Sequence, residues 1–260
     1  MSGTTTPTAA VRAAGVAELL WRRGDQPPGA LGVVPLLLGE SPAVALPWAQ
    51  VEAARAAAAG GEAALVLSEP RLAGPGWQPL VVTGRLTLVE DGDGSLFTEQ
   101  LLDQELRKHP PSRALADSPM LRREHWWYLP RLVLLLDPVS VVAGGRRDGP
   151  ADAVLAVDDD GLHVRTVRVT DWDADPLELR GAPPSVRGSA VLVGQEISVP
   201  DAERWTVHVT SGHCADGRLT GVRPAERRAL EPVPGLRARV RRQRALERGC
   251  VQALRAAGHR

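Results

Sequence analysis

The sequence has few aromatic residues apart from tryptophan: one Tyr and one Phe accompany seven Trp among 260 residues. Its two cysteines, Cys214 and Cys250, are too few for a disulfide framework or a four-thiolate metal site. No apolar run approaches the roughly 18 residues of a membrane-spanning helix, and residues 1–7 lack the basic-then-apolar pattern of a secretory signal. We therefore expect a cytoplasmic protein with reduced thiols and no membrane partner.

The chain also lacks an excess of charge of either sign. It carries 31 basic and 31 acidic side chains, and 43% of its residues are hydrophobic, enough to bury a full core. This balance argues against a nucleic-acid partner. Lys108 is the only lysine, so Arg is the ordinary surface cation and only a tight cluster of arginines is informative.

The first half of the chain alternates apolar segments with turn residues. Apolar residues between Val11 and Leu20 recur at helical spacing and predict a first helix. The polar turn 39–42 lies between two Val- and Leu-rich segments, which indicates an antiparallel hairpin. We predict strands at 30–38, 43–48, 63–68, 78–90 and 129–136, the last closed by Asp137 and Pro138, and helices at 51–59, 95–109 (with Thr98 as N-cap) and 112–127.

The second half is almost entirely predicted strand. Residues 144–150 are polar and glycine-rich, and we interpret them as a solvent-covered linker. The apolar segments 64–67 and 190–193 resemble each other, which is consistent with a degenerate duplication. The predicted strands are 153–157, 162–170, 177–180, 189–194 and 204–211, and the predicted units are 8–143, a strand-rich half at 150–233, and an arginine-rich terminal helix at 234–260.

Residues 121–131 gather the chemistry that is scarce elsewhere in the chain. Trp126, Trp127 and Tyr128 supply flat faces for stacking, and His125 supplies a ligand or a group that titrates near neutral pH. The arginines in this segment, Arg122, Arg123 and Arg131, suit a phosphate or a carboxylate. This inventory favours a site for a flat, anionic cofactor, although packing of the aromatics in the core and solvation of the arginines are the alternatives.

The order of these elements resembles a known family. Two strands, a short helix and a strand lead to the long strand Pro-Leu-Val-Val-Thr-Gly-Arg-Leu-Thr-Leu-Val-Glu at 79–90, followed by a helix and a closing strand. This order is similar to the FMN-binding split barrel of the pyridoxamine 5'-phosphate oxidase-like superfamily, over about residues 29–142. The resemblance implies a mainly β protein of the α+β class, built as an antiparallel split β-barrel, with two barrel-like halves in one chain as an alternative.

The resemblance also implies a function. Members bind FMN, and some bind the deazaflavin F420 or haem, usually between two barrels of a dimer. We therefore expect a flavin- or deazaflavin-dependent oxidoreductase with a small-molecule substrate, acting as a homodimer or as an intrachain pseudo-dimer. In the family a basic pair at a helix start grips the flavin phosphate, whereas the matching positions here are Glu52 and Ala53. Arg55, one turn further along, is the expected substitute.

Two alternatives remain open. A cofactor-free binding or scaffolding protein is favoured by Glu52 and Ala53. A haem protein would use His125 as the axial ligand. No metal site is expected, because His208, His213 and Cys214 do not have zinc-ligand spacing.

Overall fold

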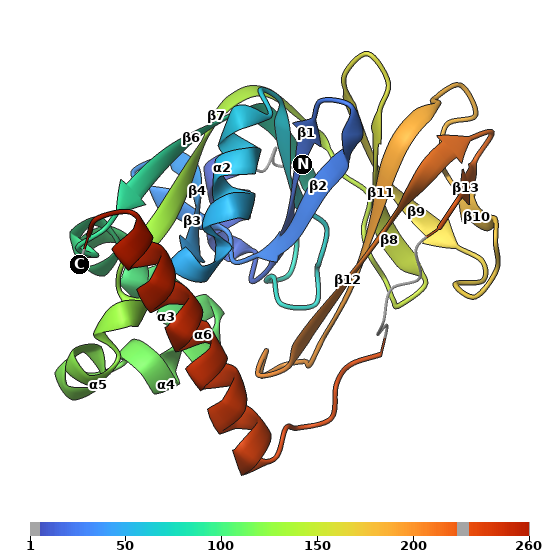
Figure 1. Ribbon diagram of the computed structural model, residues 1–260. Coiled ribbons are helices and arrows are strands. Elements are labelled where there is room, and N and C mark those ends of the chain that lie inside the picture. Colours follow the sequence, from blue (N-terminus) through green and yellow to red (C-terminus); the bar gives the residue numbers. More distant parts are fainter. Residues whose placement is uncertain (1–5, 223–228, 260) are drawn as a thin grey trace.

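The computed structural model describes residues 6–222 and 229–259 as one antiparallel sheet, one antiparallel barrel and the helices that pack on the sheet (Figure 1). The α+β class and its antiparallel strands, which the sequence predicts, are confirmed. The barrel closes in the second half of the chain, whereas the sheet of the first half is open. Among the described helices, none is long and apolar enough to cross a membrane.

The sheet has seven strands in the order β2-β1-β5-β6-β7-β4-β3. In β5 every residue is buried, and successive side chains point to opposite faces, so both faces of the sheet are covered. Ala63, Leu65 and Leu67 belong to the core under the helices, while Ala64 and Val66 face the barrel. The strands are β1 (Ala17–Arg23), β2 (Gln26–Val33), β3 (Leu36–Leu38), β4 (Ser41–Pro47), β5 (Ala63–Leu67), β6 (Leu80–Asp91) and β7 (Arg131–Ala143).

Helices cover the face of the sheet that points away from the barrel (Figure 1). The predicted helix 51–59 is confirmed as α2, where six alanines favour helix formation. The terminal helix α6 returns from the barrel to the sheet and buries Cys250 and Leu254 near η1. The helical segments are α1 (Pro7–Ala13), η1 (Trp48–Gln50), α2 (Val51–Ala59), η2 (Phe97–Leu101), α3 (Leu102–Lys108), η3 (Pro110–Ser112), α4 (Arg113–Ala116), α5 (Pro119–Glu124), η4 (Trp126–Tyr128) and α6 (Leu236–Ala256).

The barrel closes through six strands in the order β10-β13-β12-β11-β8-β9. Its interior is filled by small and branched side chains such as Leu155, Leu192 and Leu219, so it is a packed core. The short strand β13, which the sequence analysis missed, completes the closure by pairing with both β10 and β12. The strands are β8 (Asp152–Asp158), β9 (Leu162–Val169), β10 (Leu177–Arg180), β11 (Gly188–Ile197), β12 (Trp205–Ala215) and β13 (Arg218–Thr220).

A buried polar network joins the sheet to the barrel. Arg147 is 1% exposed, and its Nη1 lies 3.6 Å from Glu18 and 3.8 Å from Glu69. Ser68 Oγ and Gln195 Nε2 both donate to the Glu18 carboxylate. Because Glu18 and Ser68 come from the sheet side and Gln195 from β11, this network fixes the two parts against each other.

The buried carboxyl of Glu18 is a weaker acid than an exposed glutamate. Burial raises the pKa of Glu18 to about 7, against the opposing effects of Arg147 and Ser68. A carboxyl whose folded pKa exceeds its unfolded value of 4.5 favours the folded state when it is protonated. Its stabilising contribution is therefore complete below pH 4.5 and is lost as the pH rises through about 7.

We expect Glu18→Gln to flatten the pH dependence of stability between about pH 4.5 and pH 7. Urea unfolding at several pH values would measure the slope for both proteins. Glu40→Gln, at an exposed turn, is the control and should keep the wild-type slope. Equal slopes for the wild-type protein and Glu18→Gln would contradict the assignment.

Near the start of the chain, two sequence predictions are wrong. The helix ends at Ala13, and Val16 to Leu20 do not continue it, because β1 pairs with both β2 and β5 and buries these apolar residues in the sheet. The predicted strand 30–38 is two strands, β2 and β3, and β2 begins earlier, at Gln26. It tolerates Pro27 and Pro28 because it is an edge strand.

Three further predictions are corrected by tertiary contacts. Asp137 and Pro138 do not end β7, because an irregularity opposite Gly84 lets the pairing with β6 continue to Ala143. The loop 144–150 is not wholly solvent-covered, since it carries the buried Arg147. Thr98 is not an N-cap; the carboxylate of Asp91 accepts from the amides of Leu96 and Phe97 instead.

Candidate functional site

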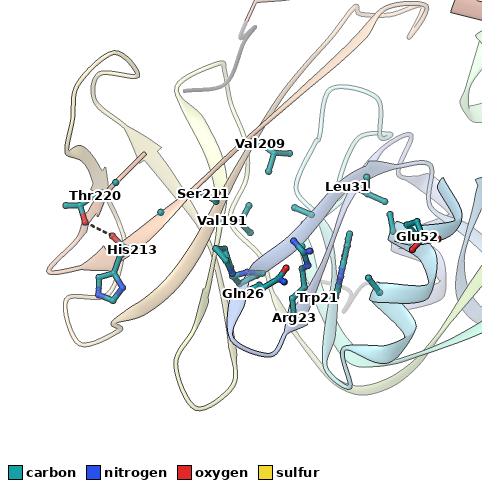
Figure 2. Close-up of a pocket in the computed structure, with 18 residues that line it drawn as sticks. Trp21, Arg23, Gln26, Leu31, Glu52, Val191, Val209, Ser211, His213 and Thr220 are labelled. Atoms are coloured by element: carbon teal, nitrogen blue, oxygen red, sulfur yellow. Dashed lines mark hydrogen bonds between the residues drawn. The ribbon is translucent and has the colours of Figure 1, made fainter. Parts of the chain in front are cut away.

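A groove of about 880 Å³ lies between the sheet and the barrel. It is formed where the β1–β2 hairpin and α2 face strands β11, β12 and β13. This volume is within the range of about 300–1,000 Å³ that is typical of small-molecule sites. Figure 2 shows the labelled residues of the groove: Trp21, Arg23, Gln26 and Leu31 from the hairpin, Glu52 from α2, Val191 from β11, and Val209, Ser211, His213 and Thr220 from β12 and β13.

Part of the wall of the groove is apolar. Ala53 and Ala56 lie on one face of α2, and Val191 and Val209 face them from the barrel. Val209 is 41% exposed, which leaves an apolar surface open at the groove. Such walls suit the flat face of a ring system.

Trp21 lies in the wall of the groove with its ring against the backbone of Gly29. A Cβ at Gly29 would lie 2.2 Å from the ring, so a glycine is needed there. Trp21 is 4% exposed, and its Nε1 has no hydrogen-bond partner among the described residues. A buried donor without a partner costs about 1–3 kcal/mol. An acceptor atom of a ligand or a water would offset this cost.

Charged side chains lie around the groove. Arg23 is exposed and makes no ion pair within the described residues, so its guanidinium is available to an anion. Glu52 also lines the groove, in the first turn of α2, where a carboxylate interacts favourably with the helix dipole. His213 is exposed, and its backbone carbonyl accepts from Thr220 Oγ1 at 3.2 Å. The groove therefore offers one arginine for an anionic group, and a carboxylate lies in the first turn of α2.

The aromatic triplet is not part of this groove. Trp126, Trp127 and Tyr128 form the turn η4, and Trp127 is 1% exposed within the core under the sheet. Tyr128 is also buried; its hydroxyl donates to Glu105 at 2.6 Å, and burial raises the pKa of this phenol. Trp127 and Tyr128 therefore present no free face to a cofactor.

Arg131 is buried beside the triplet. Its guanidinium lies 3.8 Å from the ring centre of Tyr128 and 4.2 Å from that of Phe97, and its Nη2 lies 3.4 Å from Glu105. Stacking on rings and pairing with a carboxylate are the usual ways of stabilising a buried guanidinium. Arg131 is thus engaged inside the protein and is not directed to an external anion.

The remaining residues of segment 121–131 lie at the surface or under α6. His125 is buried, with Nδ1 3.3 Å from the carbonyl of Leu115 and Nε2 2.9 Å from the amide nitrogen of Gln243. Both ring nitrogens are therefore within hydrogen-bond distance of protein groups, which leaves neither free for haem iron. Arg122 donates to the carbonyl of Ala116, and Arg123 is exposed on α5.

Trp126 borders a separate, smaller cavity of about 290 Å³ beside His259 and Leu254. Arg55, the expected substitute for the phosphate grip, also lies outside the groove: its Nε and Nη2 contact Glu90 on β6 at 2.9 and 2.8 Å. The structure therefore brings together most of segment 121–131, but it places neither that segment nor Arg55 at the large groove.

Sequence reasoning named Glu52, Ala53 and His213 but missed the other residues that line the groove. Trp21, Arg23 and Gln26 follow directly after the segment that predicts the first helix, and no strand is predicted there. A weak signal was present, because Trp21 is followed by the turn-forming Gly24 and Asp25, a pattern typical of a hairpin. The barrel side of the groove carries no local signal, since it comes from strands about 170 residues away in the sequence.

Comparisons with known proteins give structural likenesses only. No protein-family model matches the sequence, and no curated protein matches it. The chain is structurally similar to a pyridoxamine 5'-phosphate oxidase-related, FMN-binding protein from Nostoc punctiforme PCC 73102, with 14% identity and a TM-score of 0.30, over 75% of this chain and 85% of that one. It is also similar to a haem-binding protein from Mycobacterium smegmatis, with 14% identity and a TM-score of 0.35, over 96% of this chain and 100% of that one.

Proposed function

We propose that the protein binds a flat small molecule of the FMN type in the groove between the sheet and the barrel. The observation that carries the proposal is the groove of about 880 Å³ itself, whose wall includes the ring of Trp21, with an indole N–H that has no partner among the described residues. A flavin ring has both a flat apolar face and carbonyl acceptors, which suit these two features. When bound, such a group would supply hydride-transfer chemistry, and the chain would contribute orientation and exclusion of water.

The charges of the groove limit how an anionic cofactor would be held. Arg23 is the residue that would meet a phosphate, and its fork of donors suits a bidentate contact. Glu52 would repel a phosphate placed at the N-terminus of α2. The proposed pose therefore puts the anionic end near the β1–β2 hairpin and the ring against Ala53, Ala56 and the barrel wall.

A second candidate is a cofactor-free binding or scaffolding protein. Glu52 in the first turn of α2 favours it, because this is where the resembled family places its basic phosphate grip. In that case the groove would take a ligand without a phosphate. Haem held by His125 is disfavoured by the two contacts of its imidazole.

Titration with FMN, F420 and haem separates these candidates. Val209→Trp should fill the groove and weaken binding at least tenfold, whereas Val139→Trp, at an exposed position of β7, should leave binding unchanged. Trp21→Phe keeps most of the ring and removes its N–H, so we expect an affinity loss of about two- to tenfold, equivalent to one neutral hydrogen bond.

Absorption and fluorescence spectra would measure each titration. Protein that binds none of the three molecules would contradict the proposal and favour the cofactor-free candidate. Binding that Val209→Trp leaves intact would place the ligand outside the groove.

A further inference from the structure

A second cavity, of about 580 Å³, lies on the far side of the sheet from the barrel groove. It is formed where the C-terminal ends of α1 and α3 approach the β3–β4 turn. The two cavities share no lining residue. Any ligand held here would therefore be independent of the groove.

The cavity is lined by three cations and by no carboxylate. Arg12, in the last turn of α1, faces Arg107 and Lys108, in the last turn of α3. None of the three makes an ion pair within residues 6–222 and 229–259, although many other arginines of this neutral chain do. Three like charges around one cavity repel one another unless an anion lies between them.

Lys108 forms the most constrained part of this cluster. Its Nζ donates to the carbonyls of Val11 at 2.5 Å and Pro35 at 2.6 Å, which fixes the ammonium at the half-buried base of the cavity. An ammonium has three N–H groups, so one remains for a ligand. Burial, and to a lesser extent the nearby charges of Arg107 and Arg12, lowers the pKa of Lys108 to about 7.

The neutral wall of the cavity is held in place independently of any ligand. Gln104 accepts from the amide of Leu37 at 3.0 Å and donates to its carbonyl at 2.8 Å. Its amide is thereby committed to β3 and to the carbonyl of Gln100, which leaves the three cations and the side chain of Gln100 to meet a ligand. Arg12 and Arg107 are both exposed at the cavity mouth, where an anion can reach them.

We propose that this cavity binds a compact oxyanion, the phosphate or carboxylate group of a small molecule, between Arg12, Arg107 and Lys108. The bound group completes a charge cluster that the chain leaves without a counter-ion. Guanidinium groups pair bidentately with such oxyanions, and the ammonium acts as a point charge.

Calorimetric titration with inorganic phosphate and with citrate, at constant ionic strength, tests the proposal. We expect saturable binding of one equivalent of at least one of them. The double variant Arg12→Ala/Arg107→Ala should weaken that binding at least tenfold. The matched control Arg165→Ala/Arg180→Ala removes two exposed barrel arginines and should leave it unchanged.

The titrations distinguish a phosphate ligand from a carboxylate ligand, and binding in this cavity from binding in the barrel groove. Tighter binding of phosphate indicates a phosphate ester as the natural ligand, and tighter binding of citrate indicates a carboxylate. Lack of saturable binding by both ions, or binding that the Arg12/Arg107 variant keeps, would overturn the proposal. Val209→Trp, which fills the barrel groove, should leave anion binding intact, so failure of the groove ligand does not affect this test.

Discussion

Replacing Arg147 with alanine should lower the free energy of unfolding by about 3–5 kcal/mol, the range measured when one partner of a buried ion pair is removed. Arg147 is 1% exposed and is the cation nearest to the buried Glu18. Its Nε also donates to the carbonyl of Asp152 at 3.0 Å, and its Nη2 donates to the carbonyl of Gln195. The variant leaves a buried carboxylate without its cation and two carbonyls without their donor.

Urea unfolding followed by tryptophan fluorescence would measure this effect. The neighbouring Arg146→Ala is the matched control, because Arg146 is exposed and pairs with the exposed Asp148, a type of pair that contributes little to stability. Adding Glu18→Gln to Arg147→Ala should recover part of the loss, since the uncompensated carboxylate is removed. Equal stability of the Arg146 and Arg147 variants would show that the network does not hold the sheet to the barrel.

Trp127→Ala should cost a similar amount, about 3–5 kcal/mol, which is typical when a large aromatic side chain is deleted from a core. Trp127 is 1% exposed, and its ring makes edge contacts with His125 and Tyr128 at centroid distances of 6.0 Å. Because it does not line the groove, the variant should keep the ligand affinity of the fraction that remains folded.

The same variant separates the sequence interpretation from the structural one. If Trp127 stacks on a cofactor, its loss should abolish binding, and stability would change less. Trp126→Ala serves for comparison: Trp126 is only partly buried and borders the small cavity near His259, so we expect a smaller loss of stability. Thermal unfolding and ligand titration of both variants would distinguish the two interpretations.

The elements that the sequence predicted well are those with strong local signals. The alanine-rich helix 51–59 and the strand 177–180 agree with α2 and β10 in both bounds. Strands 63–68 and 162–170 differ by a residue from β5 and β9. In each case helix propensity, an apolar run or a turn residue at the boundary reports on the structure without help from distant residues.

The errors arose where distant pairing overrides local preference. Val16 to Leu20 have helical spacing but lie in or next to β1, because β2 and β5 bind it on both sides. Arg147 lies in a polar, glycine-rich segment, yet carboxylates from two other segments hold it inside the protein. The composition of a short segment cannot reveal its partners elsewhere in the chain, which for Arg147 lie more than 75 residues away.

The sequence by itself determined the class of the protein: antiparallel strands with a few helices, no net charge, and a concentration of aromatic and basic residues at 121–131. These follow from composition and periodicity, which are local properties. Only the tertiary structure decided that Trp127, Tyr128 and Arg131 of this segment are buried and that the large groove lies between α2, the β1–β2 hairpin and the barrel. The physical reason is that a cavity is the space left between elements, and its position depends on how their buried faces pack, which no single segment encodes.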